Sequence, residues 1–456
     1  MKKNDQVRKI ALDLLLKIGG EKGGYSHLTI DQAMKKYDLD TRDGALLTEI
    51  VYGTLQHKLT LEYYLNSFVN KKKKLDNWVK WLLYLSIYQM HYLTKIPDHA
   101  IIHESVEIAK KRGHKGIANF VNGVLRSVQR NGLPDLNEVK KEDKRISITT
   151  SHPNWLVNRW IKQYGIDITK AMCETNITHK QISIRTQPLK VKRTDLIKQL
   201  HEDGLKVRAS EISEQGILID QGNVLKHPAF DEHLFTVQDE SSMLVAEMMD
   251  LSEGMTILDA CSAPPGGKAT HIAEKIRDKG TVFAYDLHEK KAKLVKKKAE
   301  QLGLTCIQTG QADARKLDQV HEKATFDRIL IDAPPCSGLG VLRSKPDIKY
   351  NKEEADIKKL VSIQQEILES VALLLKKDGK LIYSTCTVNK EENELVIKRF
   401  LNENQRFIVD PLFFEELPIG LRNSQGLTEF GIQLFPQDLN SDGFFITRLT
   451  KKDSVK

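Results

Sequence analysis

Short apolar runs alternate with longer amphipathic runs through the C-terminal half of the chain, and this pattern constrains the fold most. The alternation begins near residue 235. It predicts a mostly parallel, doubly wound α/β sheet, because parallel strands need long crossover connections that are usually helices. The predicted strands are 256–260, 281–286, 306–309, 328–332, 380–384 and 443–449, and the predicted helices are 267–277, 289–302, 353–375 and 391–401.

The first part of the chain, residues 1–131, shows helical spacing of its apolar residues almost throughout. So many amphipathic segments in this length predict a compact all-α bundle. The predicted helical segments are 7–18, 44–53, 59–69, 79–93, 101–111 and 117–129. In the last segment the expected buried face consists of Ala118, Val121, Val124, Leu125 and Val128.

Two further segments lie between the bundle and the α/β region, which we place at 234–450. Residues 132–149 combine turn residues with unpatterned charge and predict a linker. Residues 150–233 predict a small α+β domain, with strands at 182–186 and 216–220 and a helix around 196–201. An RNA-facing surface and an ordinary solvated face both account for the cations of this domain. They are Arg185, Lys190, Lys192, Arg193, Lys206 and Arg208.

The charge balance favours a polyanionic partner. The chain of 456 residues has a formal net charge of +9, which is suited to nucleic acid. The run Lys71–Lys74 could contact phosphates or form a solvated loop, and the sequence leaves both open. His99 and His103 have a spacing that can bind metal, but no third ligand is apparent, so we predict no metal.

The cysteines and the apolar runs indicate the compartment. Five cysteines are an odd number and include no C-x-x-C pair, which predicts a reducing environment instead of a disulfide framework or a zinc ribbon. The most apolar stretch, 81–93, is too short to span a bilayer. We therefore expect a cytoplasmic protein that is not inserted in a membrane.

Two cysteines stand at the ends of predicted strands. Cys336 follows the run Ile329–Pro335, and Cys386 follows Leu381–Thr385. Ligands of open α/β sheets bind outside the carboxyl ends of the strands, so both thiols are expected to face one crevice. Paired thiols at such an edge are the first indication of covalent chemistry.

The loop after the first predicted strand, Asp259–Lys268, has the properties of a cofactor loop. Its glycines allow close approach of a ligand to the backbone, and the following helix offers unpaired N–H groups. Asp286 and Asp313 follow the next two strands, where they could bond ribose hydroxyls and an adenine edge. A phosphate-binding loop is excluded by Ser262 and Ala269, and no G-x-G-x-x-G occurs. A nucleoside cofactor without a pyrophosphate fits better, and S-adenosylmethionine is the candidate.

Several runs resemble the RNA cytosine-C5 methyltransferase family. The region from residue 235 to 450 is similar to that family in the runs 259–268, 332–338, 345–349 and 384–387, and in 391–393. The helical N-terminal part is similar to the NusB-type RNA-binding domain. With the small middle domain, the combination resembles bacterial members that methylate a cytosine of 16S rRNA. The resemblance implies a Rossmann-like class I methyltransferase domain that binds S-adenosylmethionine.

The resemblance also implies roles for individual residues. Cys386 would be the nucleophile that attacks C6 of cytosine, and Cys336 would assist release. Independently of the resemblance, Asp332 could bond the N3/N4 edge of the base and stabilise charge as the ring is attacked. The target cytosine would be single-stranded or flipped out, since a paired base cannot be reached. We expect the protein to be a monomer. The expected cofactor-binding residues are Cys261, Ser262, Ala263, Pro264, Pro265, Gly266, Gly267, Lys268, Asp286, Asp313 and Asp332.

Two other functions stay open on the sequence. Pro334–Cys336 also resembles DNA cytosine-C5 methyltransferases, in which the thiol after the proline pair is itself the nucleophile. A non-catalytic RNA-binding assembly factor is the second alternative. It is prompted by the doubled prolines 264–265 and 334–335, where the RNA family usually has one proline in each motif.

Overall fold

The computed structural model describes residues 3–19, 26–70, 74–333 and 337–452. The chain forms two compact units. The first contains Met1–Thr178 together with Leu342–Lys352, and the second contains His179–Val341 together with Glu353–Lys456. These units part at residue 178, within the predicted small domain 150–233. In the part that the structure describes, no helix is both long and apolar enough to cross a membrane.

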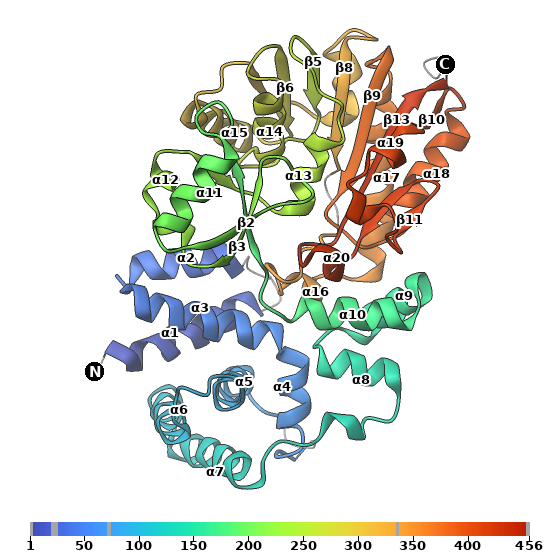
Figure 1. Ribbon diagram of the computed structural model, residues 1–456. Helices are drawn as coiled ribbons and strands as arrows, with labels where there is room; N and C mark the ends of the chain where they lie inside the picture. Colours follow the sequence, from blue (N-terminus) through green and yellow to red (C-terminus); the bar gives the residue numbers. More distant parts are fainter. Residues whose placement is uncertain (1–2, 20–25, 71–73, 334–336, 453–456) are drawn as a thin grey trace. The chain divides into compact units, whose positions relative to one another are not determined.

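The first unit is helical, as predicted (Figure 1, blue to cyan). Helix α5 (Asn77–Tyr92) is buried from Trp81 to Gln89 and provides much of the core. In α7 (Lys115–Asn131) the buried residues are those predicted from their spacing, Ala118 through Val128. The other helices are α1 (Lys3–Ile18), α2 (Ser26–Lys36), α3 (Thr41–Gln56), α4 (Lys58–Leu65), α6 (Asp98–Arg112), η1 (Leu136–Glu138), α8 (Glu142–Thr149), α9 (Asn154–Tyr164), α10 (Ile166–Asn176) and α16 (Ile348–Asn351).

Helix α8 lies within the predicted linker 132–149. Its buried residues are Ile146 and Ser147, and Thr60 of α4 donates a hydrogen bond of 2.6 Å to the carbonyl of Ile148. The sequence Glu142–Arg145 is charged because only one side of this short helix is covered. An interpretation based on charge alone therefore missed the helix.

The inserted segment Leu342–Lys352 is held in the helical unit by a buried lysine. Lys349 is 0% exposed, and its Nζ donates a hydrogen bond of 2.9 Å to the carbonyl of Gln56. Burial lowers the pKa of Lys349 to about 7. It also lowers the pKa of the neighbouring His152 well below the usual value, and the charge of Lys349 adds to that effect. Tyr350 makes a second anchor, because its hydroxyl donates to the carbonyl of Ser151 at 3.1 Å.

The second unit begins with a small antiparallel sheet of order β2-β3-β1-β4. Its strands are β1 (Ile182–Thr186), β2 (Lys206–Ala209), β3 (Gly216–Gln221) and β4 (Phe235–Val237). Helices α11 (Arg193–Glu202) and α12 (Pro228–Asp231) and the short turn η2 (Val224–Lys226) accompany them. Ile184, Leu196, Ile217 and Phe235 belong to one core cluster. Strand β4 pairs with β1, so the first residues of the predicted α/β region complete the middle sheet instead.

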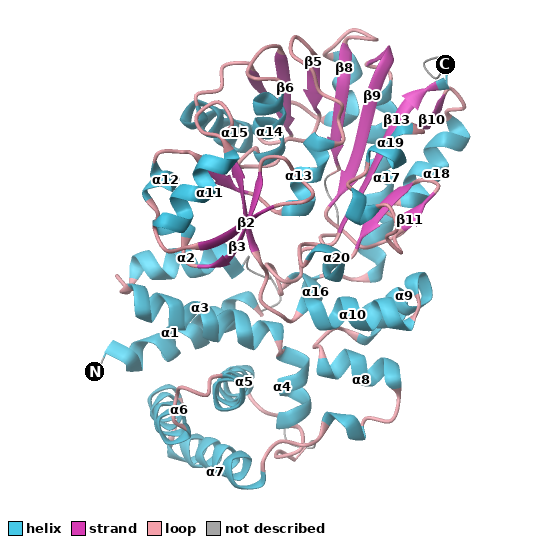
Figure 2. Ribbon diagram, viewed as in Figure 1, coloured by secondary structure: helices cyan, strands magenta, loops and turns pink. Residues whose placement is uncertain are grey.

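The large sheet has the order β11-β12-β13-β9-β8-β5-β6-β7, with β10 paired to β13 (Figure 2). Strands β9, β8, β5, β6 and β7 are parallel, as predicted, while β10 to β13 pair in antiparallel fashion. The strands are β5 (Thr256–Asp259), β6 (Thr281–Asp286), β7 (Ile307–Gln311), β8 (Phe326–Asp332), β9 (Leu375–Thr385), β10 (Phe407–Val409), β11 (Leu427–Thr428), β12 (Gly431–Leu434) and β13 (Phe444–Lys451).

Helices cover both faces of this sheet because successive strand residues point to opposite sides. Ile257 packs in a cluster with Leu244 and Ile272, whereas its neighbour Leu258 packs in a cluster with Leu368 and Ile397. The helices are α13 (Glu240–Glu247), α14 (Gly267–Lys275), α15 (Glu289–Leu302), η3 (Ala314–Gln319), α17 (Glu354–Ala372), α18 (Glu394–Glu403), α19 (Leu412–Glu416), η4 (Ile419–Leu421) and α20 (Pro436–Leu439).

Candidate active site

A cavity of about 200 Å³ opens where strands β5 and β8 end. This is the edge at which an open α/β sheet binds its ligands. The wall combines the predicted loop, the last residues of two strands and a segment that leads into α13. The lining residues are Val237, Gln238, Ser242, Asp259, Cys261, Ser262, Ala263, Pro264, Pro265, Gly267, Lys268 and Asp332.

Gly266 sets the geometry of the loop. Its φ is +86°, and a Cβ at this position would lie 2.7 Å from Cγ1 of Val295. A side chain would therefore be strained in its backbone and would collide with α15. Gly266 is also the N-cap of α14, so the first N–H groups of that helix point toward the loop. The peptide bond between Pro264 and Pro265 is cis.

Lys268 and Asp332 form an ion pair at the floor of the cavity. Lys268 Nζ lies 2.8 Å from Asp332 Oδ2, and the hydroxyl of Ser384 donates to Asp332 Oδ1 at 3.0 Å. Burial alone would lower the pKa of Lys268, but Asp332, Cys386 and Asp259 outweigh burial and raise that pKa above its usual value. The ammonium is thus a fixed positive charge in the electrostatic environment of Cys386.

Asp259, at the end of β5, is a fully buried carboxyl group of the same site. Burial raises the pKa of Asp259 to about 7, and the nearby charge of Asp332 adds to the rise. Two carboxylates at adjacent strand ends share one ammonium, so ionising both is costly. Near neutral pH the carboxyl group of Asp259 is therefore close to its titration midpoint.

The cysteines differ in their surroundings. Cys386 follows the end of β9 and is half-buried. Burial raises the pKa of Cys173 and of Cys306 to about 12 and raises the pKa of Cys261 well above the usual value, which disfavours their thiolates. Cys336, like Pro334 and Pro335, lies outside the described residues. Among the described cysteines, Cys386 is the one that combines partial exposure with a neighbouring ammonium, as a nucleophile requires.

Buried polar side chains hold the residues that directly follow the two cysteines, Ser337 and Thr387. The carboxylate of Glu392, which is 0% exposed, accepts from the backbone N–H of Ser337 at 2.8 Å and from Asn389 Nδ2 at 2.9 Å. Asn393 Nδ2 donates to the carbonyl of Thr387 at 3.1 Å. The run 391–393 that we matched to the methyltransferase family therefore lies directly behind both loops.

The structure does not bring every predicted residue to the cavity. Gly266, Asp286, Asp313 and Cys386 are not among its lining residues. Asp286 Oδ1 accepts from the N–H of His288 at 2.7 Å, and Asp313 caps η3 and pairs with Arg315 at 2.7 Å. The cofactor roles of Asp286 and Asp313 stay predictions.

Four residues of the wall were not among the predicted site residues. Val237, Gln238 and Ser242 precede the loop motif and reach the cavity because β4 pairs with β1 of the small sheet. No local pattern in the sequence marks that long-range pairing. Asp259 begins the motif, but only the structure shows that it faces the cavity.

A second cavity, of about 270 Å³, lies in the helical unit and is lined by residues of α1 and α6 that include His103. Within the described part of the chain, no group of three or more His, Cys, Asp or Glu side chains could hold a metal ion. The run Lys71–Lys74 falls mainly on residues that the structure does not describe.

Three known families match successive parts of the chain. The NusB family matches residues 5–130, the ferredoxin-like domain of the RsmF/B-like methyltransferases matches 152–225, and the family described as 16S rRNA methyltransferase RsmB/F matches 246–450. These matches cover first the N-terminal helices, then α9, α10 and strands β1 to β3, and then the large sheet.

Individual proteins are similar over the whole length. The probable ribosomal RNA small subunit methyltransferase B of Bacillus subtilis (strain 168) is 44% identical over 450 residues, covering 99% of this chain and 100% of that protein. A protein of the same description from Synechocystis is 33% identical, covering 98% and 99%. The crystal structure of PH0851 superposes with a TM-score of 0.80 at 26% identity, covering 99% of each chain.

Proposed function

Because the chain belongs to the 16S rRNA methyltransferase RsmB/F family, we propose that it transfers a methyl group from S-adenosylmethionine to C5 of a cytosine in 16S rRNA. One observation carries the proposal beyond family membership. The Lys268–Asp332 ion pair lies at the strand ends beside Cys386, with Lys268 in the electrostatic environment of that thiol. By resemblance to RsmB, the target is cytosine 967.

The described residues fit such a cofactor. The cavity of about 200 Å³ is bounded by a glycine turn at a helix N-terminus, which suits an anionic group of a ligand. Asp259, which lines the cavity, can add negative charge that suits a sulfonium as its carboxyl group ionises. When bound, S-adenosylmethionine supplies an electrophilic methyl group. We propose that residues 261–268 and Asp332 hold it, with Asp286 and Asp313 on its ribose and adenine.

The residues of the chain then divide the chemistry. C5 of cytosine is a weak nucleophile, and addition of a thiolate at C6 makes it enamine-like. We propose that Cys386 forms the bond to C6 and that Lys268 stabilises its thiolate by charge. Asp332, oriented by Ser384, would bond the N3/N4 edge of the base as charge develops there. After transfer, a base takes the C5 proton, the C5–H electron pair re-forms the C5–C6 double bond, and Cys386 leaves C6 as a thiolate. We assign this release to Cys336, whose thiolate would accept the proton.

The other parts of the chain would bring RNA to this edge. We propose that residues 1–131 form a NusB-like RNA-binding domain, that 150–233 form the small α+β domain, and that 234–450 form the catalytic domain. The target cytosine would be single-stranded or flipped out of its helix. We further propose that a monomer acts on rRNA in the cytoplasm.

Covalent trapping tests the reaction. Purified Cys336→Ala and Cys386→Ala proteins are incubated with S-adenosylmethionine and small-subunit rRNA, and RNA–protein bands are sought on a denaturing gel. Cys336→Ala is expected to accumulate an adduct, because release is impaired, and Cys386→Ala is expected to give none. Cys306→Ala, which alters a buried thiol elsewhere in the second unit, is the control and should turn over like the wild type.

The other outcomes favour the alternative functions. An adduct that requires Cys336 and persists in Cys386→Ala would indicate the nucleophile of the DNA-methylating family. RNA binding by the wild type without any methyl transfer would indicate an assembly factor. Mapping of 5-methylcytosine on the product RNA tests cytosine 967 separately.

A further inference from the structure

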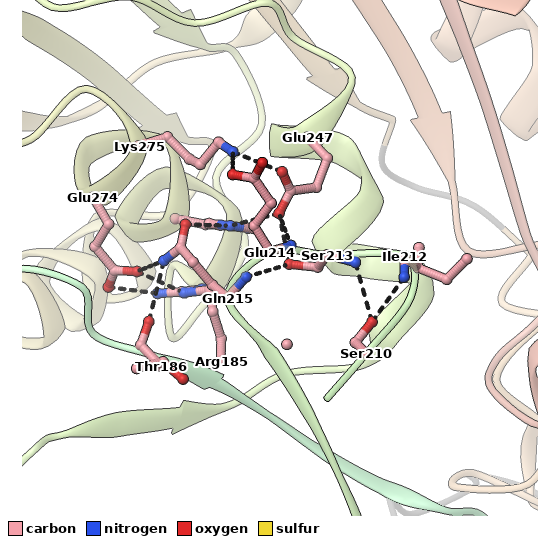
Figure 3. Close-up of polar contacts among 12 residues, drawn as sticks. Arg185, Thr186, Ser210, Ile212, Ser213, Glu214, Gln215, Glu247, Glu274 and Lys275 are labelled. Atoms are coloured by element: carbon pink, nitrogen blue, oxygen red, sulfur yellow. Dashed lines mark hydrogen bonds and ion pairs between the residues drawn. The ribbon is translucent and has the colours of Figure 1, made fainter. Parts of the chain in front are cut away.

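Arg185 lies behind the cavity, buried in an ion pair with Glu274 of α14 (Figure 3). The side chains of Arg185 and Glu274 are 0% and 1% exposed. Arg185 was among the cations expected on an RNA-facing or solvated surface of the small domain. That expectation was wrong for this residue, because its side chain points from β1 toward α14. A buried charge needs partners, and the identity of those partners indicates what it does.

All five N–H donors of the guanidinium are used. Nε and Nη2 each donate to the carboxylate of Glu274 at 2.8 Å. The remaining three donate to the carbonyl of Gly267 at 2.7 Å, to Thr270 Oγ1 at 3.0 Å and to Oε1 of Gln238. Gly267 and Gln238 both line the cavity. One side chain of the small sheet therefore holds two separate parts of the cavity wall.

The contact with Arg185 decides which way the amide of Gln238 faces. A guanidinium can only donate, so Oε1 must point at Arg185 and Nε2 must point away. Nε2 lies 3.4 Å from Oγ of Ser242, another residue of the wall. Nε2 thus points toward Ser242 on the cavity wall, and it carries a second N–H besides the one directed at Ser242. Without Arg185 the amide of Gln238 could also turn over, because the hydroxyl of Ser242 can either donate or accept a hydrogen bond.

Neighbouring groups hold Glu274 in place. Gln215 Nε2 donates to Glu274 Oε2 at 3.0 Å and to the carbonyl of Thr186 at 3.1 Å, as Figure 3 shows. Burial lowers the pKa of His271 well below its usual value, and Arg185 contributes to the lowering, so the ring is neutral. It lies 3.0 Å from Gln215 Oε1. The ion pair is thus fixed from both sides.

We propose that Arg185 is a positioning residue for cofactor binding. Anchored on the first turn of α14, it acts through Gln238, whose amide it turns so that an N–H bonds an oxygen of the cofactor. The role rests on the proposed function only in the identity of that cofactor. Lys268, which pairs with Asp332, follows Gly267 directly. The contact of Arg185 with the Gly267 carbonyl therefore also fixes the backbone of Lys268.

Calorimetric titration with S-adenosylhomocysteine, the product form of the cofactor, tests the role without requiring RNA. Arg185→Lys keeps the charge but loses the fork that reaches Gly267 and Gln238. It should weaken binding about tenfold, and Gln238→Leu should weaken it by a similar factor. If Arg185 acts through Gln238, the double variant should also lose about tenfold, well short of the hundredfold expected for independent effects.

A matched control and a paired variant separate positioning from stability. Arg448 is equally buried, and its ion pair with Asp410 has a length of 2.7 Å. Neither residue lines the cavity, so Arg448→Lys should leave binding unchanged. Arg185→Met combined with Glu274→Met removes both buried charges while keeping volume, which often preserves stability. Its melting temperature should stay near that of the wild type while its affinity stays about tenfold low.

Three results would overturn the proposal. They are unchanged affinity in Arg185→Lys, wild-type affinity in the Met/Met variant, and multiplicative losses in the Arg185→Lys/Gln238→Leu double variant. A wild type that fails to bind S-adenosylhomocysteine would refute the cofactor and the positioning role together. Binding without methylation of rRNA would refute the proposed reaction alone.

Discussion

Ser337 and Thr387 share a buried hydrogen bond, with 2.7 Å between Ser337 Oγ and Thr387 Oγ1. Each directly follows one of the two cysteines that we propose to be catalytic. The bond therefore joins the segment after β8 to the segment after β9. A second link, from the N–H of Gly340 to the carbonyl of Cys386 at 3.2 Å, holds the same two loops.

Thr387→Val should slow catalysis more than it lowers stability. The substitution keeps the shape but leaves the buried hydroxyl of Ser337 without this partner, a loss of about 1 kcal/mol in the free energy of unfolding. Misplacement of the two loops should lower the rate of methyl transfer by about tenfold or more. Single-turnover methylation and urea unfolding measure the two effects. The control is Thr447→Val, since the equally buried Thr447 Oγ1 has no hydrogen bond among the described residues. Equal rates in the two variants would contradict the prediction.

Glu392→Gln should weaken the same region from behind. The carboxylate accepts only from N–H groups, namely those of Ser337, Asn389 and Gln364. A glutamine amide must turn an NH2 group toward one of these donors, which should cost about 1–3 kcal/mol of stability. We also expect less adduct in the Cys336→Ala background, as measured on denaturing gels. Glu415→Gln alters an exposed carboxylate of α19 and is the control. If Cys336→Ala/Glu392→Gln forms the adduct as fast as Cys336→Ala does, the carboxylate of Glu392 has no role in holding the loops.

The repeating parts of the fold could be predicted from the sequence, and the irregular parts could not. Strand β6 and helix α15 have the bounds that their periodicity predicts, because each buries one regular face. Helix α13 was missed because its residues Met243–Ala246 are all buried, which erases the amphipathic signal. The antiparallel strands β10 to β12 were missed because they are short and depend on pairing with distant residues.

The residues of the candidate site also fall into those that the sequence could predict and those that it could not. Gly266, Lys268 and Asp332 stand in contiguous motifs, so their chemistry could be predicted without coordinates. Gln238 reaches the cavity only through the pairing of β4 with β1, which no local pattern encodes. Arg185 shows the opposite limit, because a cation in a basic segment gives no sign of being buried. Its partner Glu274 is 89 residues away in sequence.

Asp259→Asn should change how stability depends on pH. The pKa of Asp259 is raised to about 7 in the folded protein, from an ordinary 3.8. Between these values the folded state holds the proton more tightly than the unfolded state, so wild-type stability falls as pH rises, by at most about 1.4 kcal/mol per pH unit. Asparagine does not ionise. The stability of the variant relative to wild type should therefore grow from pH 4 to 7 and stay constant above 7.

Urea unfolding midpoints at pH 5, 6, 7 and 8 measure this difference. Asp378→Asn, which removes an exposed carboxylate from the same unit, should show no such trend. A difference between Asp259→Asn and wild type that does not vary with pH would show that the carboxyl group ionises normally.

Lys349→Met should weaken the dependence of the stability of the helical unit on pH in the alkaline range. The pKa of Lys349 falls to about 7 on folding, from 10.5, so the unfolded state binds more protons between these values. The free energy of unfolding of the wild type should therefore rise with pH from about 7 to 10.5, by at most about 1.4 kcal/mol per pH unit. Methionine removes this contribution. Denaturant unfolding at pH 7, 8, 9 and 10 compares the two proteins, with the exposed Lys162→Met as control. A parallel rise in Lys349→Met would contradict the assignment.

The placement of Leu342–Lys352 has a consequence for how such a protein can evolve. The polypeptide passes between the two compact units at 178, at 341 and again at 352. Part of the core of the helical unit is therefore encoded inside the gene region for the large sheet. A single recombination that exchanged the N-terminal helices would replace α3, whose Gln56 carbonyl accepts from Lys349, and would leave a buried amino group among side chains that had not been selected to surround it. The N-terminal helices are therefore expected to evolve together with Leu342–Lys352, a segment of the same unit that is encoded far downstream.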